Sequence, residues 1–337
     1  MKKLGKILLW AAAALVVLLV AAISLTIGWR PFIGPQARPL TSHQFERTPQ
    51  RLERGKYLFT ASTGCTGCHS LHDWNTHGGP VLAGGEGVGQ VMWFSNLPGR
   101  IVAPNITPDP ETGSGRWTDD QLARAIREGI GHDGRALFPM MPYEEFRHMS
   151  DEDLASIVVY MRSLPPVRHE LPKTEIIFPV KYLIRNVPQP ITEPVSSPER
   201  SDPVKWGQYL VTIASCTECH TPRLRGDVVS GMEYGGGFML KGPWGAAAGA
   251  NITPDASGIA YYDESLFIQA MRTGYVKARK LNSIMPFDEF GKLTDDDLKA
   301  MFAYLRTLKP VKHRVDNGLP PTYCKLCRQT HGAGDQN

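Results

Sequence analysis

The feature that most constrains this chain is a pair of Cys-x-x-Cys-His pentapeptides, at residues 65–69 and 216–220. The pattern is typical of covalent haem attachment, because two thiols can add to the haem vinyl groups while the adjacent imidazole lies beneath the iron. A zinc site would need four convergent ligands, and a thioredoxin-like motif normally lacks the histidine. We therefore predict two covalently bound haem c groups. The attaching residues are Cys65, Cys68, Cys216 and Cys219, and the proximal iron ligands are His69 and His220.

An internal repeat surrounds the two pentapeptides. The hexapeptide Met-Pro-Tyr-Glu-Glu-Phe at 141–146 recurs as Met-Pro-Phe-Asp-Glu-Phe at 285–290, and residues 151–167 recur in step as 295–311. Asn-Ile-Thr-Pro-Asp also occurs twice, and each copy is first of all a turn signal. The chain therefore contains one unit twice, and each copy carries one pentapeptide.

The sixth iron ligand is expected from the loop before the last helix of each unit. Met141 and Met285 occupy matching positions there, and each precedes a proline. Met140 is the alternative in the first unit, but the register of the repeat favours Met141. Ligation by histidine and methionine leaves no open coordination position on the iron. Such an iron is suited to electron transfer rather than to chemistry on a substrate.

Each unit is predicted to close with a helix. Ser150 and Thr294 stand at N-cap positions, apolar residues follow them at helical spacing, and a proline ends each pattern. A middle helix is predicted over residues 119–128 and again over 263–273. The apolar faces of these helices are interpreted as core rather than as binding sites.

Together these features resemble the class I cytochrome c family, specifically the membrane-bound multihaem cytochrome c subunits of periplasmic alcohol, aldehyde and gluconate dehydrogenases. The resemblance covers residues 52–311 and rests on the pentapeptide, the later Met-Pro and the closing helix. It implies an all-α fold of two tandem cytochrome c domains, in which the first and last helices cross beside the haem. Gly55 and Gly207 are expected where these helices cross, although a single glycine can equally be a helix start. The related subunits often carry three haems, whereas this chain has two such domains.

The N-terminal segment 7–29 contains no ionisable side chain. About 20 apolar residues span the hydrocarbon core of a membrane as a helix. Lysines precede the segment and Arg30 and Arg38 follow it, which predicts a cytoplasmic N-terminus and an exported remainder. A cleaved signal peptide is the alternative, but its apolar region would be unusually long. The predicted location is the bacterial inner membrane, with the haem domains in the periplasm.

The predicted organisation has five parts. Residues 1–30 form the transmembrane anchor or signal peptide, 45–167 the first cytochrome c domain, 168–203 a proline-rich linker, 204–313 the second domain, and 314–337 a tail. The linker is expected to be semi-rigid, because prolines favour extended backbone.

The tail contains a third Cys-x-x-Cys pair, Cys324 and Cys327, followed by arginine instead of histidine. The haem-attachment pattern is therefore broken. In an oxidising compartment a disulfide is the expected state of such a pair. Metal binding through His331, or a thiol that acts on a partner, are the alternatives.

Charge and motifs together favour an electron carrier. The formal net charge of the chain is only +4, and its Lys and Arg residues are spread along the sequence. Both features argue against binding of nucleic acid. We predict a dihaem cytochrome that accepts electrons from a membrane-associated dehydrogenase and passes them to quinone, a soluble cytochrome or an oxidase. The alternative is a haem enzyme with one open iron site, such as a dihaem peroxidase or a thiosulfate-oxidising cytochrome. A redox sensor or assembly factor is a third class.

His72, His77 and His132 are interpreted as loop residues rather than ligands.

Overall fold

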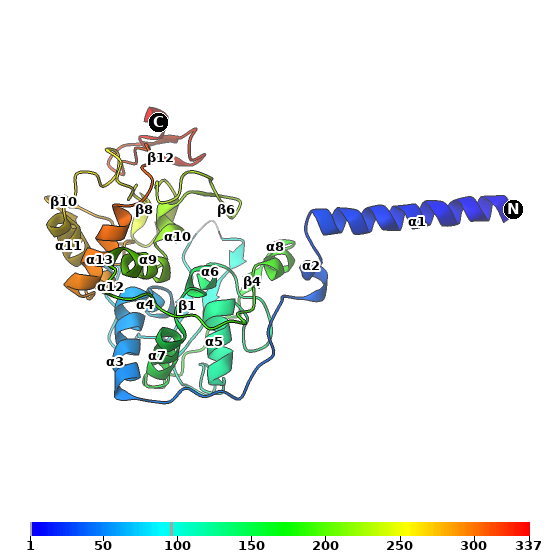
Figure 1. Ribbon diagram of the computed structural model, residues 1–337, viewed down its shortest axis with the longest axis horizontal. Helices are drawn as coiled ribbons and strands as arrows, with labels where there is room; N and C mark the ends of the chain where they lie inside the picture. Colours follow the sequence, from blue (N-terminus) through cyan, green and yellow to red (C-terminus); the bar gives the residue numbers. More distant parts are fainter. Residues whose placement is uncertain (1, 95–96) are drawn as a thin grey trace.

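The computed structural model describes residues 2–94 and 97–337 of the protein. Helix α1 (Lys2–Leu25) projects away from the folded body (Figure 1). Within the described part of the chain, it is the one helix that is long and apolar enough to cross a membrane. Its mean hydropathy is 2.8, and none of the span is buried against the rest of the protein. A signal sequence near the N-terminus can have the same length and apolar composition. The short helix α2 (Arg30–Ile33) follows, and its Pro31 carbonyl accepts a hydrogen bond from Arg185 in the connector between the domains.

The first repeat unit contains three helices of 9, 10 and 11 residues and the short helix of the first pentapeptide. The elements are α3 (Pro49–Tyr57), the π-helix η1 (Leu58–Ser62), α4 (Cys65–His69), β1 (Gln90–Val91), β2 (Gly99–Arg100), β3 (Val102–Ala103), α5 (Asp119–Glu128), α6 (Tyr143–Phe146) and α7 (Asp151–Met161). Thr118 and Ser150 cap α5 and α7 through their side-chain oxygens, as the sequence predicts for the closing helix.

The second unit repeats the order of the α-helices. Its elements are α9 (Pro203–Ile213), α10 (Cys216–His220), β5 (Arg223–Leu224), β6 (Asp227–Val228), β7 (Met239–Gly242), β8 (Gly245–Ala248), α11 (Glu264–Thr273), β9 (Tyr275–Val276), β10 (Arg279–Lys280), α12 (Phe287–Phe290) and α13 (Asp295–Leu305). Between the units lie β4 (Glu175–Ile176), α8 (Val180–Leu183) and η2 (Ile184–Asn186). The tail forms β11 (Pro321–Tyr323), β12 (Thr330–Gly332) and the short 3-10 helix η3 (Gly334–Gln336).

The first and last helices of each unit cross at a glycine. Helix α3 packs on α7, and α9 packs on α13. A Cβ atom at Gly55 would collide with the carbonyl oxygen of Ser156, and one at Gly207 would collide with that of Ala300. The expectation that both glycines mark close approaches is therefore confirmed. Only hydrogen fits between the two backbones at these points.

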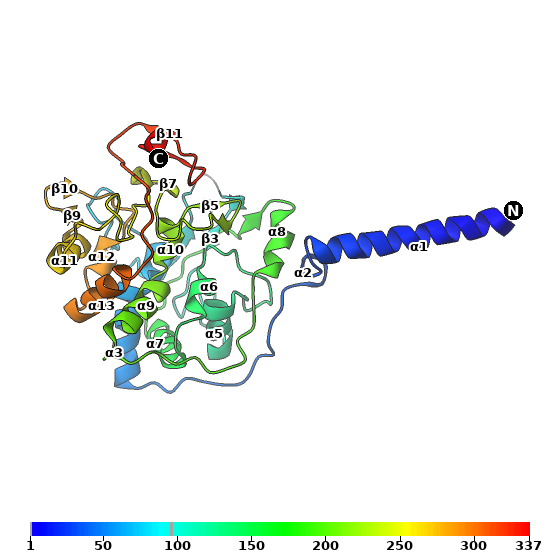
Figure 2. The same ribbon diagram turned by 45° about the horizontal axis from the view of Figure 1, so that its top comes forward.

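The two units share one hydrophobic core, and a pair of reciprocal hydrogen bonds joins them. The Tyr57 hydroxyl in the first unit donates to Asp297 at the start of α13, at 2.5 Å. The Tyr209 hydroxyl in the second unit donates to Asp153 at the start of α7, at 2.7 Å. Figure 2 shows the two helix pairs side by side, with α1 standing clear of both. The duplicated units therefore dock through equivalent surfaces.

The prediction of an all-α fold is correct for the core but incomplete. Among the described residues the chain forms six two-stranded antiparallel sheets. They lie in the glycine-rich loops, the connector and the tail, and most strands are two residues long. Glycines with positive φ, such as Gly89 and Gly236, let these loops fold back tightly enough for short strands to pair. Strands this short carry too few alternating residues to give a periodic signal.

Candidate haem sites

Both pentapeptides form short helices, α4 and α10. Each follows a residue in the left-handed region, Gly64 with φ of 63° and Ser215 with φ of 54°. This turn redirects the chain after the preceding long helix. The structure therefore places each pair of cysteines and its histidine on one five-residue helix.

The two proximal histidines have the same backbone partner. His69 Nδ1 lies 2.8 Å from the Pro104 carbonyl oxygen, and His220 Nδ1 lies 2.7 Å from that of Ala250. A carbonyl oxygen can only accept, so Nδ1 carries the proton and the Nε2 lone pair is left for a metal. Burial lowers the pKa of both imidazoles, which keeps them neutral. The donor set therefore fits an axial iron ligand in both units.

The repeated Asn-Ile-Thr-Pro-Asp motif holds these acceptor carbonyls in place. Asn105, next to Pro104, donates from Nδ2 to the Val167 carbonyl at 2.8 Å, and Asn251 donates to that of Val311 at 2.7 Å. The threonine two residues after each asparagine donates its backbone N–H to the asparagine oxygen. The motif thus fastens the histidine-supporting loop to the segment after the closing helix. Sequence reasoning recognised the turn but missed this role.

The four attachment thiols also fit haem. All are free cysteines, and burial raises the pKa of each to about 12. Burial therefore makes a charged thiolate costly at these positions when no cation is present. A thioether to a haem vinyl group carries no charge and has no such cost. The four residues are Cys65, Cys68, Cys216 and Cys219.

The two predicted methionine ligands have matching backbone surroundings. Met141 and Met285 are partly buried and pack against the shared core. Each donates its N–H to a carbonyl three residues earlier at 3.1 Å, and each carbonyl accepts from the residue two positions later at 2.8 Å. Met140 instead packs with a separate cluster around Met92 and Ile101. The equivalence supports the register that selects Met141, and the iron ligation itself remains a prediction.

A second pair of reciprocal contacts joins the two haem motifs to the opposite domains. The hydroxyl of Thr66, inside the first pentapeptide, donates to Glu289 Oε1 at 2.5 Å. The hydroxyl of Thr217, inside the second, donates to Glu145 Oε1 at 2.7 Å. Both glutamates belong to the repeated hexapeptide after the methionine, which is the signal that could have identified them. Each attachment helix therefore lies at the domain interface.

His72, His77 and His132 lie outside the helices and named strands, as expected. His72 contacts the carbonyl oxygens of Gly79 and Thr66, and the ring of His132 packs on Trp117 at a centroid distance of 4.3 Å. His77 reaches into the second domain, where its ring packs against Phe287. The disulfide expected in the tail is absent from the described residues, because Cys324 and Cys327 are both free.

Comparison with known proteins agrees with this geometry. The family model "Cytochrome c" matches residues 52–165 and again 204–309, which is more than half of the chain. The chain belongs to the cytochrome c family. Covalently bound haem c is therefore its cofactor, held by tandem domains of this family.

Three relatives show the range of proteins that this chain resembles. A nicotinate dehydrogenase subunit of Pseudomonas putida is 32% identical over 85% of this chain and 23% of its own length. The fructose dehydrogenase cytochrome subunit of Gluconobacter japonicus is 33% identical over 76% of this chain and 52% of its own length. A diheme cytochrome c-type protein of Cereibacter sphaeroides is 30% identical over 77% of this chain and 86% of its own length. The chain thus spans about half or less of the first two relatives.

Proposed function

We propose that this protein is a dihaem electron carrier of a membrane-associated dehydrogenase or respiratory chain. The observation that carries the proposal is the duplicated donor set. In each domain one five-residue helix presents two cysteines and a histidine whose Nδ1 is bonded to a backbone carbonyl. When bound, haem supplies a one-electron Fe(III)/Fe(II) couple. The chain has to hold the iron rigidly on both sides and keep its surroundings unchanged.

The axial pairs in this proposal are His69 with Met141 and His220 with Met285. The Nδ1–carbonyl bond fixes the plane and tautomer of each imidazole, which orients Nε2. Methionine on the opposite side raises the reduction potential and closes the sixth position. A closed iron favours electron transfer over the alternative, a haem enzyme with an open site.

The domain interface supports transfer between the two haems. Thr66 and Thr217 each bond to the other domain, so both attachment helices face the interface. Burial raises the pKa of the Cys219 thiol to about 12, and the nearby Glu218 and, from the other domain, Cys68 add to this rise. Trp74 in the first domain also packs on Trp244 in the second, with ring centroids 5.0 Å apart. An aromatic interface of this kind would hold the two cofactors at a fixed separation.

The N-terminal helix supports a place at the bacterial inner membrane. Lysines 2, 3 and 6 precede the apolar span, whereas Arg30 and Arg38 follow it. In this proposal α1 is a retained anchor with its N-terminus in the cytoplasm and the haem domains in the periplasm. The names of the relatives, which include fructose and gluconate dehydrogenase cytochrome subunits, support a dehydrogenase as electron donor. Quinone, a soluble cytochrome or an oxidase would accept the electrons.

The test is spectroscopic. The full-length protein, purified in detergent, is expected to contain two haems per chain by the alkaline pyridine assay and to show no spectral change when carbon monoxide is added after reduction. Met141→Ala and Met285→Ala should each lower the potential of one haem, on the order of 0.1 V, and let carbon monoxide bind there. Met140→Ala is the matched control and should change neither. Carbon monoxide binding by the unmodified protein would favour the haem-enzyme alternative instead.

A further inference from the structure

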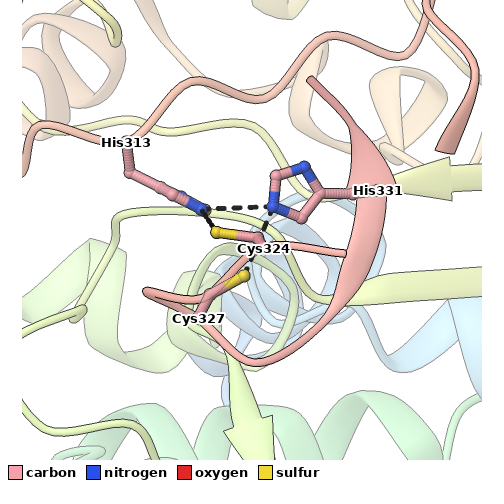
Figure 3. A group of neighbouring side chains, drawn as sticks. All are labelled: His313, Cys324, Cys327 and His331. Atoms are coloured by element: carbon pink, nitrogen blue, oxygen red, sulfur yellow. Dashed lines mark hydrogen bonds between the residues drawn. The ribbon is translucent and has the colours of Figure 1, made fainter. Parts of the chain in front are cut away.

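Four side chains of types that can bind a metal ion converge where the C-terminal tail meets the second domain. His313 follows helix α13, Cys324 and Cys327 lie in the loop between β11 and β12, and His331 lies in β12. Their ligand atoms are all within 4.8 Å of one another. Figure 3 shows the four side chains pointing toward a common centre. We propose that these residues form a structural zinc site that fastens the C-terminal tail to the second domain.

The spacing of the four atoms is that of a tetrahedral zinc shell. His313 Nε2 lies 3.2 Å from His331 Nε2, and each sulfur lies 3.3 or 3.4 Å from one of these nitrogens. Zinc–nitrogen bonds of about 2.0 Å and zinc–sulfur bonds of about 2.3 Å at tetrahedral angles give nitrogen–nitrogen and nitrogen–sulfur edges of about 3.3 to 3.5 Å and a sulfur–sulfur edge of about 3.8 Å. The three distances match the corresponding edges, and all the other pairs lie within 4.8 Å, so one ion can bind between the four atoms.

The protonation of the two imidazoles points to a cation between them. His313 Nδ1 lies 2.7 Å from the Gly235 carbonyl oxygen, and His331 Nδ1 lies 2.9 Å from that of Gly332. Both Nδ1 atoms therefore carry the proton, and both Nε2 lone pairs face each other at 3.2 Å. Two facing lone pairs repel, and a metal ion turns this repulsion into two bonds. The Nδ1–carbonyl bonds are the outer contacts that metal-binding histidines usually make.

Burial and charge also favour zinc over a disulfide. All four side chains have a relative exposure of 0%. Two thiolates and two neutral imidazoles around a divalent cation sum to zero charge, which avoids the cost of a buried net charge. A disulfide between Cys324 and Cys327 would leave the facing imidazoles with no ion to bind. A closed set of two cysteines and two histidines is a structural zinc set, with no position left for a substrate.

The repeat provides an internal comparison. His169 occupies the position in the first unit that His313 occupies in the second, and its Nδ1 lies 2.9 Å from the Val88 carbonyl oxygen. This backbone contact is common to both units, whereas the cysteines converge in the second unit alone among the described residues. Both histidines can therefore hold a loop through this backbone contact, but only His313 has further ligands beside it for a metal ion.

The site is connected to the second haem motif through one loop. Gly235 accepts the His313 bond, and the next residue, Gly236, donates its N–H to the carbonyl of His220 at 2.7 Å. Gly237 lines the site, because a Cβ there would lie 2.8 Å from His313 Cε1 and 3.2 Å from Cys327 Sγ. The metal would therefore hold the loop that supports His220, as well as the tail.

The test measures metal directly and does not depend on electron transfer. Full-length, haem-loaded protein is dialysed against a chelator, given zinc chloride, desalted and analysed by plasma mass spectrometry. We expect one zinc per chain, and zinc-edge X-ray absorption showing two sulfur ligands at about 2.3 Å and two nitrogen ligands at about 2.0 Å. Mass spectrometry after thiol labelling without reductant should find no disulfide between Cys324 and Cys327.

The matched variants are His313→Gln and His169→Gln. Each loses an imidazole bonded to a backbone carbonyl, but only His313→Gln is expected to lose the zinc. The proposal would be overturned if the unmodified protein failed to bind zinc tightly, whether its thiols are free or joined in a disulfide. It would also be overturned if the zinc were coordinated mainly by oxygen. If His313→Gln does not fold, the absorption spectrum of the unmodified protein decides alone.

Discussion

The two glutamates of the repeated hexapeptide occupy equivalent positions but differ in burial. Glu145 is half-buried, whereas Glu289 has an exposed fraction of 2%. Glu289 Oε1 accepts from Thr66, and among the described residues Oε2 has no hydrogen-bond partner. Burial raises the pKa of Glu289 to about 7. A proton on Oε2 would also let this carboxyl act as a donor.

This pKa predicts how stability depends on pH. Between pH 4.5, the ordinary value, and about 7, the folded protein binds one more proton at Glu289 than the unfolded chain does. The free energy of unfolding should therefore fall as pH rises through this window, by up to about 1.4 kcal/mol per unit. Glu289→Gln should remove this slope, and Thr66→Val should extend it to higher pH because it removes the hydrogen bond that favours the carboxylate. Denaturant titrations at several pH values test this, and an unchanged slope in Glu289→Gln would contradict it.

At the scale of elements, the sequence predicts what is encoded locally. Ser150 and Thr294 cap the closing helices, and the middle helix of the first unit spans Asp119–Glu128 as expected. Contacts between distant segments could not be predicted in this way. Thr66 meets Glu289 across 223 positions of the chain; the repeated hexapeptide singles out the glutamate, but no local pattern indicates that it pairs with Thr66. The same holds for His313, whose role depends on how the tail folds back.

The crossing glycines give a test at this scale. Gly55→Ala and Gly207→Ala each place a Cβ against a carbonyl oxygen of the opposite helix, so the helix pair must separate. We expect each change to lower the free energy of unfolding by about 2 kcal/mol or more, as overpacking of a core does. Gly5→Ala, in open space within α1, is the control and should have no effect on unfolding of the haem domains. The measurement is thermal unfolding followed by circular dichroism.

The two domains are joined by equivalent hydrogen bonds that occur twice, once from the first domain to the second and once from the second to the first. Tyr57 and Thr66 reach from the first domain to the second, and Tyr209 and Thr217 reach back. Because these contacts join a shared core, the domains do not have separate interiors. Neither domain could then unfold without exposing the apolar surface of the other.

We therefore expect the two domains to unfold in a single cooperative transition. Tyr57→Phe and Tyr209→Phe each remove a hydrogen bond to a buried aspartate, and each should lower the free energy of unfolding by about 1–3 kcal/mol. Trp206 stacks on Tyr209 and also donates to Asp297, the partner of Tyr57, so the two sites are linked and the double variant should depart from the sum of the two effects. Far-ultraviolet circular dichroism and haem absorbance, recorded during the same denaturant titration, should give coincident curves in all three variants. Two separate transitions in the unmodified protein would mean that the domains fold independently and that the interface does not fix the separation of the haems.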